Sequence, residues 1–289
     1  MIALVTLAAT PSLPAATNAV VRVASLAPSL TEIICAIDAA DCLVGRSSAC
    51  HYPAAVVKRV PVAGDFGIPI LEALAKCAPD LVVTVDMEDK NSVQAIEHLG
   101  IRHESIPCRS LDDIPRAIRT VGRLLHRETA AEKLAVKFSD TLANLRQHPP
   151  AERRRVFVEI WGDPLITAGK KSFLNDLIEL AGGENIASDV ARDFFQISTE
   201  SVLARDPEVV ILLEPGSVDI SKRSGWEQLA AVKANRICRD LDRDLLEIPG
   251  PRVLQAVEAL RRCFRFERAA SVLIEPNTST EQSTRSTIK

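Results

Sequence analysis

Short apolar runs alternate with amphipathic stretches along residues 20–110. The runs are rich in β-branched residues, as buried strands are, and the stretches carry apolar side chains at helical spacing. Ser29 and Glu32 have the spacing of a helix-start capping box, and Gly100 is placed to end a helix. Strands are predicted in VVRVASLAP, CLVGRSS, PDLVVTV and IRHESIP, helices in SLTEIICAI, PILEALAKCA and SVQAIEHLG, and an irregular loop in ACHYPAAVVKRVP. This alternation predicts a parallel sheet covered by helices.

A long amphipathic stretch interrupts the alternation between residues 110 and 147. Its apolar side chains recur at helical spacing, first as far as Leu125 and then again from Leu134. Thr129 and Glu132 have the spacing of a second capping box, which favours a kink near residues 126–128. At a rise of about 1.5 Å per residue, the part that follows the kink would be roughly 27 Å long. The stretch is therefore predicted to be a helical spacer.

The alternation resumes after residue 150, and part of it repeats the first half. The segment EALAKCAPDLVV begins at Glu72 and ESVLARDPEVVI begins at Glu200, and in each a proline stands seven positions after the glutamate. An acidic residue and a β-rich run follow in both. A chance recurrence of a common helix–proline–strand order is the alternative explanation. Strands are predicted in VFVEIWG, PEVVILL and ICRDLD, and helices in FLNDLIELAGG, TESVLARD, GWEQLAAVKANR and PRVLQAVEALRRCF.

These patterns together predict an α/β fold of two Rossmann-like lobes of related design, joined by a long backbone helix. Two lobes leave a cleft between them, and ligands favour such interfaces. The simplest function for that architecture is to carry a solute. The predicted units are a signal-like segment at 1–19, an N-terminal lobe at 20–110, a linking helix at 111–150, a C-terminal lobe at 151–270 and a disordered Ser/Thr-rich tail at 271–289.

The first nineteen residues resemble an export signal. MIALVTLAATPSLPAATNA has an apolar run followed by prolines and small residues, but it lacks the basic start that such signals have. Its apolar run is too short to cross a bilayer. We therefore expect an exported chain whose signal is cleaved or truncated at its start, and the alternative is an apolar arm.

Composition and motifs give little sign of catalysis or nucleic-acid binding. The net charge of −3 offers no electrostatic reason for a nucleic-acid partner. The seven cysteines contain no C-x-x-C pair, so no zinc or redox motif is indicated, and an odd count leaves at least one thiol free or paired between chains. A phosphate loop before Lys170 is excluded because position 164 is proline. We predict no catalytic residues, no metal site, no cofactor and no enzymatic activity.

Several segments together resemble the vitamin B12 and ferric-siderophore periplasmic-binding family, the solute-binding components of ABC importers. The resemblance runs from about Val21 to Arg268 and is closest to the cobalamin-binding branch. It implies a monomer in the periplasm that holds a corrinoid between its lobes and delivers it to a permease with ATPase subunits. The segments are RVASLAPSLTEIICAI, LVGRSSACHYP, LEALAKCAPDLVV, DPLITAGKKSFLNDLIELAGGENIA, QISTESVLARDPEVVI and GPRVLQAVEAL.

The resemblance also implies roles for individual residues. Glu72 and Glu200 match the glutamates by which each lobe docks onto arginines of the permease; the plainer explanation is an acid favoured at a helix N-terminus. Asp244 matches an acidic position near the cleft, or is a solvated loop residue. The resemblance also implies five residues for the aromatic walls of a cobalamin site, although each of them could instead be buried in a lobe core. They are Tyr52, Phe66, Trp161, Phe194 and Phe195.

Two alternatives to a corrinoid carrier stay open on the sequence. Ile248 stands where the cobalamin binder has arginine, which leaves a ferric siderophore or haem as the ligand, with His51 and Tyr52 as adjacent candidate ligands to iron. A cytosolic two-lobed α/β enzyme would require a catalytic group between the lobes.

Because a long helix resists bending, we expect little change of lobe angle on binding.

Overall fold

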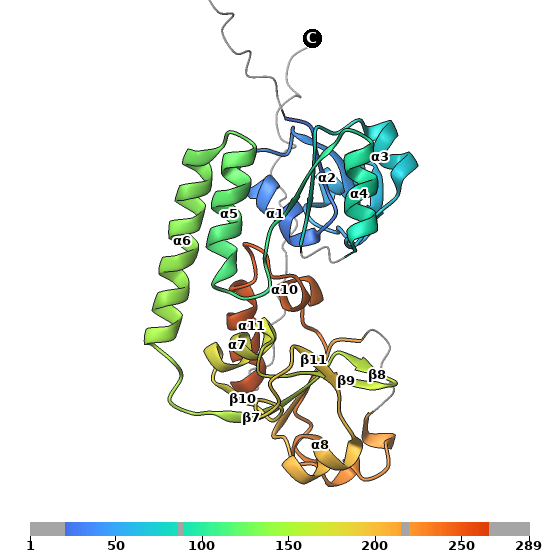
Figure 1. Cartoon of the computed structure of the whole chain (residues 1–289). Coiled ribbons are helices and arrows are strands. Elements are labelled where there is room, and N and C mark those ends of the chain that lie inside the picture. Colours follow the sequence, from blue (N-terminus) through green and yellow to red (C-terminus); the bar gives the residue numbers. More distant parts are fainter. Residues whose placement is uncertain (1–20, 86–88, 215–219, 266–289) are drawn as a thin grey trace, which may run out of the picture.

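The protein is described here from a computed structural model that covers residues 21–85, 89–214 and 220–265. It has two α/β lobes, one above the other, with a pair of long helices along one side (Figure 1). The α/β fold of two lobes joined by a helix is therefore as predicted. The signal-like segment and the tail from residue 271 lie outside the described residues. In the part of the chain that is described, no helix is both long and apolar enough to cross a membrane.

The N-terminal lobe is built on a six-stranded sheet in the order β4-β3-β2-β1-β5-β6. All neighbouring strands are parallel except β4, which runs antiparallel to β3. Every residue of β1 and β5 is buried, as expected for β-branched runs in the middle of a sheet. The elements are β1 (Val23–Ser25), α1 (Pro28–Ala36), β2 (Leu43–Ser47), α2 (Ala54–Arg59), β3 (Val62–Asp65), β4 (Ile68–Pro69), α3 (Leu71–Cys77), β5 (Leu81–Thr84), α4 (Lys90–His98) and β6 (Arg102–Ser105).

Two local expectations for this lobe are wrong. The segment expected to be an irregular loop contains α2. Helix α1 begins at Pro28 with no side-chain cap, so Ser29 and Glu32 form no capping box. Both residues are buried, and the Glu32 carboxylate instead binds Arg252 from the distant C-terminal lobe, a partner that helix-start spacing cannot reveal.

The C-terminal lobe has a four-stranded parallel sheet in the order β10-β7-β12-β13 and a separate three-stranded antiparallel sheet, β11-β9-β8. The second sheet was not predicted. Its strands are β8 (Trp161–Gly162), β9 (Leu165–Ala168) and β11 (Phe194–Gln196), and the other elements are β7 (Arg154–Glu159), α7 (Phe173–Leu180), β10 (Gly183–Asn185), α8 (Thr199–Arg205), β12 (Val209–Leu212), η1 (Ile220–Lys222), η2 (Trp226–Gln228), α9 (Ala230–Lys233), β13 (Ile237–Cys238), α10 (Arg243–Glu247) and α11 (Gln255–Arg265). The helix expected over GWEQLAAVKANR is therefore two short ones, because Leu229 between them is extended.

The helical spacer is a hairpin and not a kinked rod. Helices α5 (Asp113–Leu124) and α6 (Glu128–Gln147) lie side by side, and α6 alone continues to the C-terminal lobe (Figure 1). The chain reverses at His126, whose φ is 55°. The expected capping box of Thr129 and Glu132 is absent; the Glu132 carboxylate accepts hydrogen bonds from Arg119 of α5 at 2.7 and 2.9 Å.

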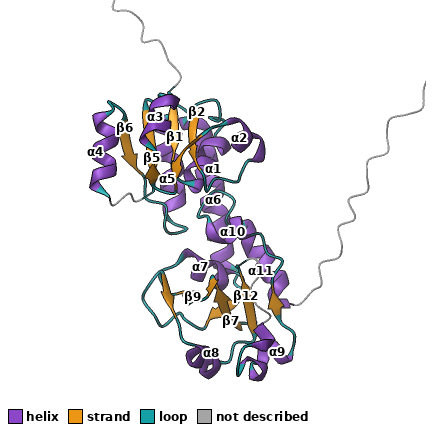
Figure 2. Cartoon of the chain, turned by 90° about the vertical axis from the view of Figure 1, so that its right-hand side faces the viewer, coloured by secondary structure: helices purple, strands orange, loops and turns teal. Residues whose placement is uncertain are grey.

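The hydrophobic core is continuous from one lobe to the other through these helices. One cluster of buried side chains includes Val83 of β5, Ile118 of α5, Phe138 of α6, Leu177 of α7 and Val257 of α11. Each lobe has a smaller cluster of its own on another face of its sheet. The lobes therefore share packed side chains and are not merely tethered. In Figure 2, α6 and α10 lie where the two lobes meet.

Candidate functional site

The sequence repeat is a repeated structural unit. Helices α3 and α8 each have seven residues, with Glu72 and Glu200 at the second position. Both helices end in a left-handed residue, at Ala78 with φ 45° and at Asp206 with φ 41°. A parallel strand follows in each lobe, so the two glutamates hold equivalent places.

An arginine closes this unit in the same way in both lobes. The Arg22 Nε donates to the carbonyl of Ala78 at 2.9 Å, and the Arg155 Nε donates to the carbonyl of Asp206 at 3.0 Å. The backbone N–H of each arginine donates to the acid that follows the proline: Asp80 in one lobe and Glu208 in the other, at 2.9 and 3.0 Å. This match of hydrogen bonds extends the likeness of the two segments from the sequence to the structure.

Glu72 and Glu200 are both exposed, in helices that lie in different lobes, at opposite ends of the molecule (Figure 1). The Glu72 side chain is 80% exposed and is paired with Lys76 one turn later, at 2.7 Å. Each acid sits in the first turn of its helix, where the helix dipole favours it. Their placement is compatible with docking, which stays a prediction.

An exposed aromatic residue precedes each of these helices, in the turn between β3 and β4 in one lobe and in β11 in the other. Phe66 and Phe194 each stand six positions before their glutamate, and their side chains are 57% and 50% exposed. Strands β4 and β11, which follow or contain them, are both antiparallel to their neighbours. The sequence identified both aromatics as candidates but not their equivalence.

A hollow of about 310 Å³ lies between the lobes. Phe66 and His51 line it from the N-terminal lobe, and Asp244 and Ile248 line it from the C-terminal lobe. The His51 Nδ1 is 3.4 Å from the Asp244 Oδ1. An aromatic wall, an imidazole and a carboxylate thus converge from both halves of the chain.

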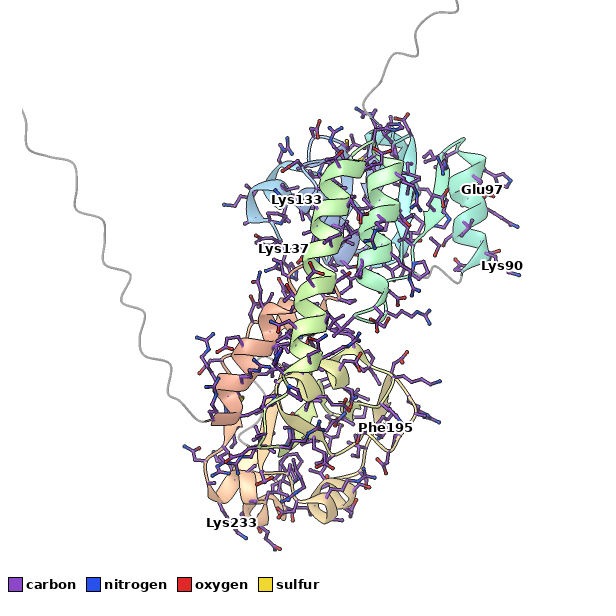
Figure 3. All side chains as sticks on the ribbon, turned by 90° about the vertical axis from the view of Figure 1, so that its left-hand side faces the viewer. Lys90, Glu97, Lys133, Lys137, Phe195 and Lys233 are labelled. Atoms are coloured by element: carbon purple, nitrogen blue, oxygen red, sulfur yellow. A yellow bond between two sulfur atoms is a disulfide. The ribbon has the colours of Figure 1, made fainter. Side chains whose placement is uncertain are left out.

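Tyr52 faces a different hollow of about 550 Å³, between α1, α6 and the start of α11. Its ring is covered by Arg252, whose guanidinium carbon lies 3.7 Å from the ring centroid. Figure 3 shows Lys137 of α6 on the side of the molecule where this hollow opens. The structure therefore does not bring Tyr52 into one hollow with Phe66 and Asp244.

A buried ion pair ties the lobes together beside these hollows. Arg252 donates to both carboxylate oxygens of Glu32, at 3.0 and 2.6 Å, and the Glu32 side chain is only 3% exposed. Burial raises the pKa of the Glu32 carboxyl, and the arginine lowers that pKa in part. The Cys108 thiol adds a contact across the lobes, 2.9 Å from the carbonyl of Pro249. Local sequence patterns could not indicate these pairings because the partners are more than a hundred residues apart.

The remaining aromatic candidates belong to the three-stranded sheet and line neither hollow. Trp161 is half exposed, and its indole N–H donates to the carbonyl of Asp163 at 2.8 Å. Phe195 packs in part against the core of the C-terminal lobe (Figure 3). Phe194 lies beside it with its side chain exposed.

Fixed charges that the sequence did not indicate lie next to Trp161. Glu159, at the end of β7, is fully buried and accepts two hydrogen bonds from Arg223, at 2.5 and 2.8 Å. These bonds raise the pKa of the Arg223 guanidinium, which also lies 4.8 Å from the ring centroid of Trp226. Glu214 accepts from the backbone N–H of Gly162 at 2.7 Å. The end of β7 therefore carries buried charge close to the exposed indole of Trp161.

No metal centre is evident among the described residues, in which no group of three or more His, Cys, Asp or Glu side chains is arranged to hold an ion. Cys238 and Cys263 form a disulfide between β13 and α11. The other five cysteines form no disulfide in the described part of the chain. Burial raises the pKa of the Cys35 thiol to about 11, which makes it a poor nucleophile.

Comparison with known proteins gives one consistent result. The sequence profile of the periplasmic binding proteins matches residues 23–243. An ABC transporter substrate-binding lipoprotein of Bacillus subtilis, itself uncharacterised, is 28% identical over 83% of this chain and 78% of its own. The vitamin B12-binding protein of Pectobacterium carotovorum is 30% identical over 83% of this chain and 86% of its own. A periplasmic haem-binding protein of Roseiflexus, solved in apo form, superposes with a TM-score of 0.75 at 26% identity, over 85% of this chain and 98% of that one.

Proposed function

Because this chain belongs to the periplasmic binding protein family, we propose that it is the substrate-binding component of an ABC importer and that it holds a corrinoid between its lobes. The observation that carries the proposal is the hollow to which Phe66 of one lobe and Asp244 of the other both contribute. An aromatic side chain offers a flat apolar wall, and a carboxylate accepts from amide groups of the kind that a corrinoid presents. The likeness to a vitamin B12-binding protein supports this choice of ligand.

Haem or a ferric siderophore is the second candidate ligand. His51 lines the same hollow and its Nδ1 faces Asp244, so an imidazole is available to an iron centre. Ile248, which stands where the cobalamin binder has arginine, lines this hollow too. The likeness to a haem-binding protein supports this alternative.

Delivery requires a membrane partner, and we assign it to the permease of the importer with its ATPase subunits. Glu72 and Glu200, exposed at equivalent places in the two lobes, would each meet a basic site on that partner. Exposed charges mainly raise the rate and set the orientation of association. In this proposal the chain works as an exported monomer and catalyses no reaction.

Calorimetric titration of the purified protein with cyanocobalamin, haem and a ferric hydroxamate siderophore tests the ligand. We expect heat with cyanocobalamin, and binding about tenfold weaker or worse in Phe66→Ala and Asp244→Asn. Val136→Ser, at an exposed site on α6, is the matched control and should bind as the unchanged protein does. If haem alone produces heat, and His51→Ala abolishes that heat, then the ligand is haem and not a corrinoid.

A further inference from the structure

The surface between the exposed phenylalanine and the exposed glutamate differs in chemistry between the lobes. The two copies of this segment read FGIPILE, from Phe66 to Glu72, and FFQISTE, from Phe194 to Glu200. Their common register makes Ile68 equivalent to Gln196, Ile70 to Ser198 and Leu71 to Thr199. One lobe is apolar at three positions at which the other is polar.

The apolar residues of the N-terminal copy are exposed. Ile68, Ile70 and Leu71 have 62%, 46% and 41% of their surface accessible, and we call these three residues the apolar stripe. The stripe begins next to Phe66, which lines the hollow between the lobes, and ends next to Glu72. With Phe66, four exposed apolar side chains fall within six consecutive residues, a grouping that single, scattered surface residues do not explain.

Formation of the helix does not require the stripe. The C-terminal lobe forms its seven-residue helix α8 with Gln196, Ser198 and Thr199 at the equivalent positions. The inward side of each helix is held by another equivalent pair, Leu74 and Val202, and both of these are fully buried.

Ile70 of the stripe also leaves helix α3 without the side-chain cap that stabilises the start of α8. Ser198 caps α8, since its side chain accepts from the backbone N–H of Ser201 at 3.2 Å. Ile70 occupies the same place before α3 and provides no cap. A residue that weakens the helix start and exposes apolar surface is explained by contact with a partner.

We propose that the apolar stripe docks into an apolar recess of the importer's permease, beside the basic site that receives Glu72, while the C-terminal lobe presents polar side chains to the permease at the three equivalent positions. The proposal rests on the proposed function and adds a chemical difference between the two docking ends. The stripe runs directly into Glu72, which the proposed function places against the permease, and this continuity favours the permease over a lipid surface or a second copy of the chain. Lys76, paired with Glu72 at 2.7 Å, balances the charge at this end of the stripe, so charge alone does not select the partner.

Binding to the permease–ATPase complex encoded in the same genome, reconstituted in nanodiscs, tests the stripe. The variant Ile68→Gln/Ile70→Ser/Leu71→Thr gives the N-terminal unit the residues that its counterpart already folds with. We expect it to bind the complex at least about tenfold more weakly at both low and high salt, because apolar contacts are not screened. Glu200→Gln should weaken binding mainly at low salt. Val136→Ser should bind as the unchanged protein does.

Other outcomes separate the failure of the stripe from the failure of the function. Normal binding by the triple variant, with Glu72→Gln and Glu200→Gln both weakened, would overturn the stripe and leave the transport function standing. No binding of the unchanged protein to the complex would overturn the function. Binding to empty nanodiscs would assign the stripe to lipid, and a dimer in sedimentation that the triple variant abolishes would assign it to self-association; either result overturns the proposal.

Discussion

Arg252 of the C-terminal lobe contacts two residues of the N-terminal lobe. It pairs with Glu32 of α1, covers the ring of Tyr52 and stands just before α11. The carboxylate of Glu32 is almost inaccessible to water, so its charge depends on that one guanidinium. Removing a single partner of a buried ion pair is costly because the remaining charge is neither solvated nor paired.

The variant Arg252→Met should therefore lower the free energy of unfolding by about 3 kcal/mol at neutral pH. Denaturant unfolding followed by circular dichroism measures this value. The double variant Glu32→Gln/Arg252→Met should recover part of the loss, because no buried charge then lacks a partner. Equal stabilities of the double variant and of Arg252→Met would contradict this explanation.

The loss in Arg252→Met should also depend on pH. Burial already raises the pKa of the Glu32 carboxyl in the folded protein, and removal of the arginine raises that pKa further. A carboxyl whose folded pKa is raised adds stability below its unfolded pKa and loses that stability as the pH rises through the folded value. The variant should therefore be less destabilised at pH 5 than at pH 8. Glu32→Gln, which has no carboxyl at this position, should show no such recovery.

At the scale of elements, local patterns predicted the repeat and a helical spacer with a break near residues 126–128, but not the reversal of the chain at that break. The unit around Glu72 recurs around Glu200 because its helix, proline and strand are all encoded within a few residues. The reversal between α5 and α6 is different, since amphipathic spacing is the same in a kinked helix and in a hairpin. What decides it is a close approach: a Cβ on Gly122 would lie 2.3 Å from the Cβ of Ala131.

Gly122→Ala should destabilise the hairpin for this reason, by about 1–3 kcal/mol in the free energy of unfolding. Ala131→Gly alone should cost about 1 kcal/mol or less, as expected for glycine in a helix. Combining the two substitutions restores the space between α5 and α6, so the double variant should be more stable than Gly122→Ala. Additive losses, measured by thermal and denaturant unfolding, would show that the contact is not what limits position 122.

At the scale of the whole molecule, the sequence predicted two lobes and an interlobe ligand, while the composition of the hollow had to come from the structure. Phe66 and Asp244 were both candidates, yet their common hollow depends on how far the lobes lie apart, which no local pattern encodes. Tyr52 shows the reverse case. It is the neighbour of His51 in sequence, but the two side chains line different hollows.

The same interlobe contacts predict how the molecule responds to its ligand. The core runs through α5 and α6 into both lobes, and the pair of Glu32 and Arg252 closes the second connection. Opening the lobes would break packed contacts and expose a buried charge together, so one lobe angle is strongly favoured. Small-angle scattering with and without saturating ligand should give radii of gyration that agree within error. In Arg252→Met, with one of the two connections lost, ligand should produce a larger compaction; a marked compaction of the unchanged protein would mean that these contacts do not hold the lobes.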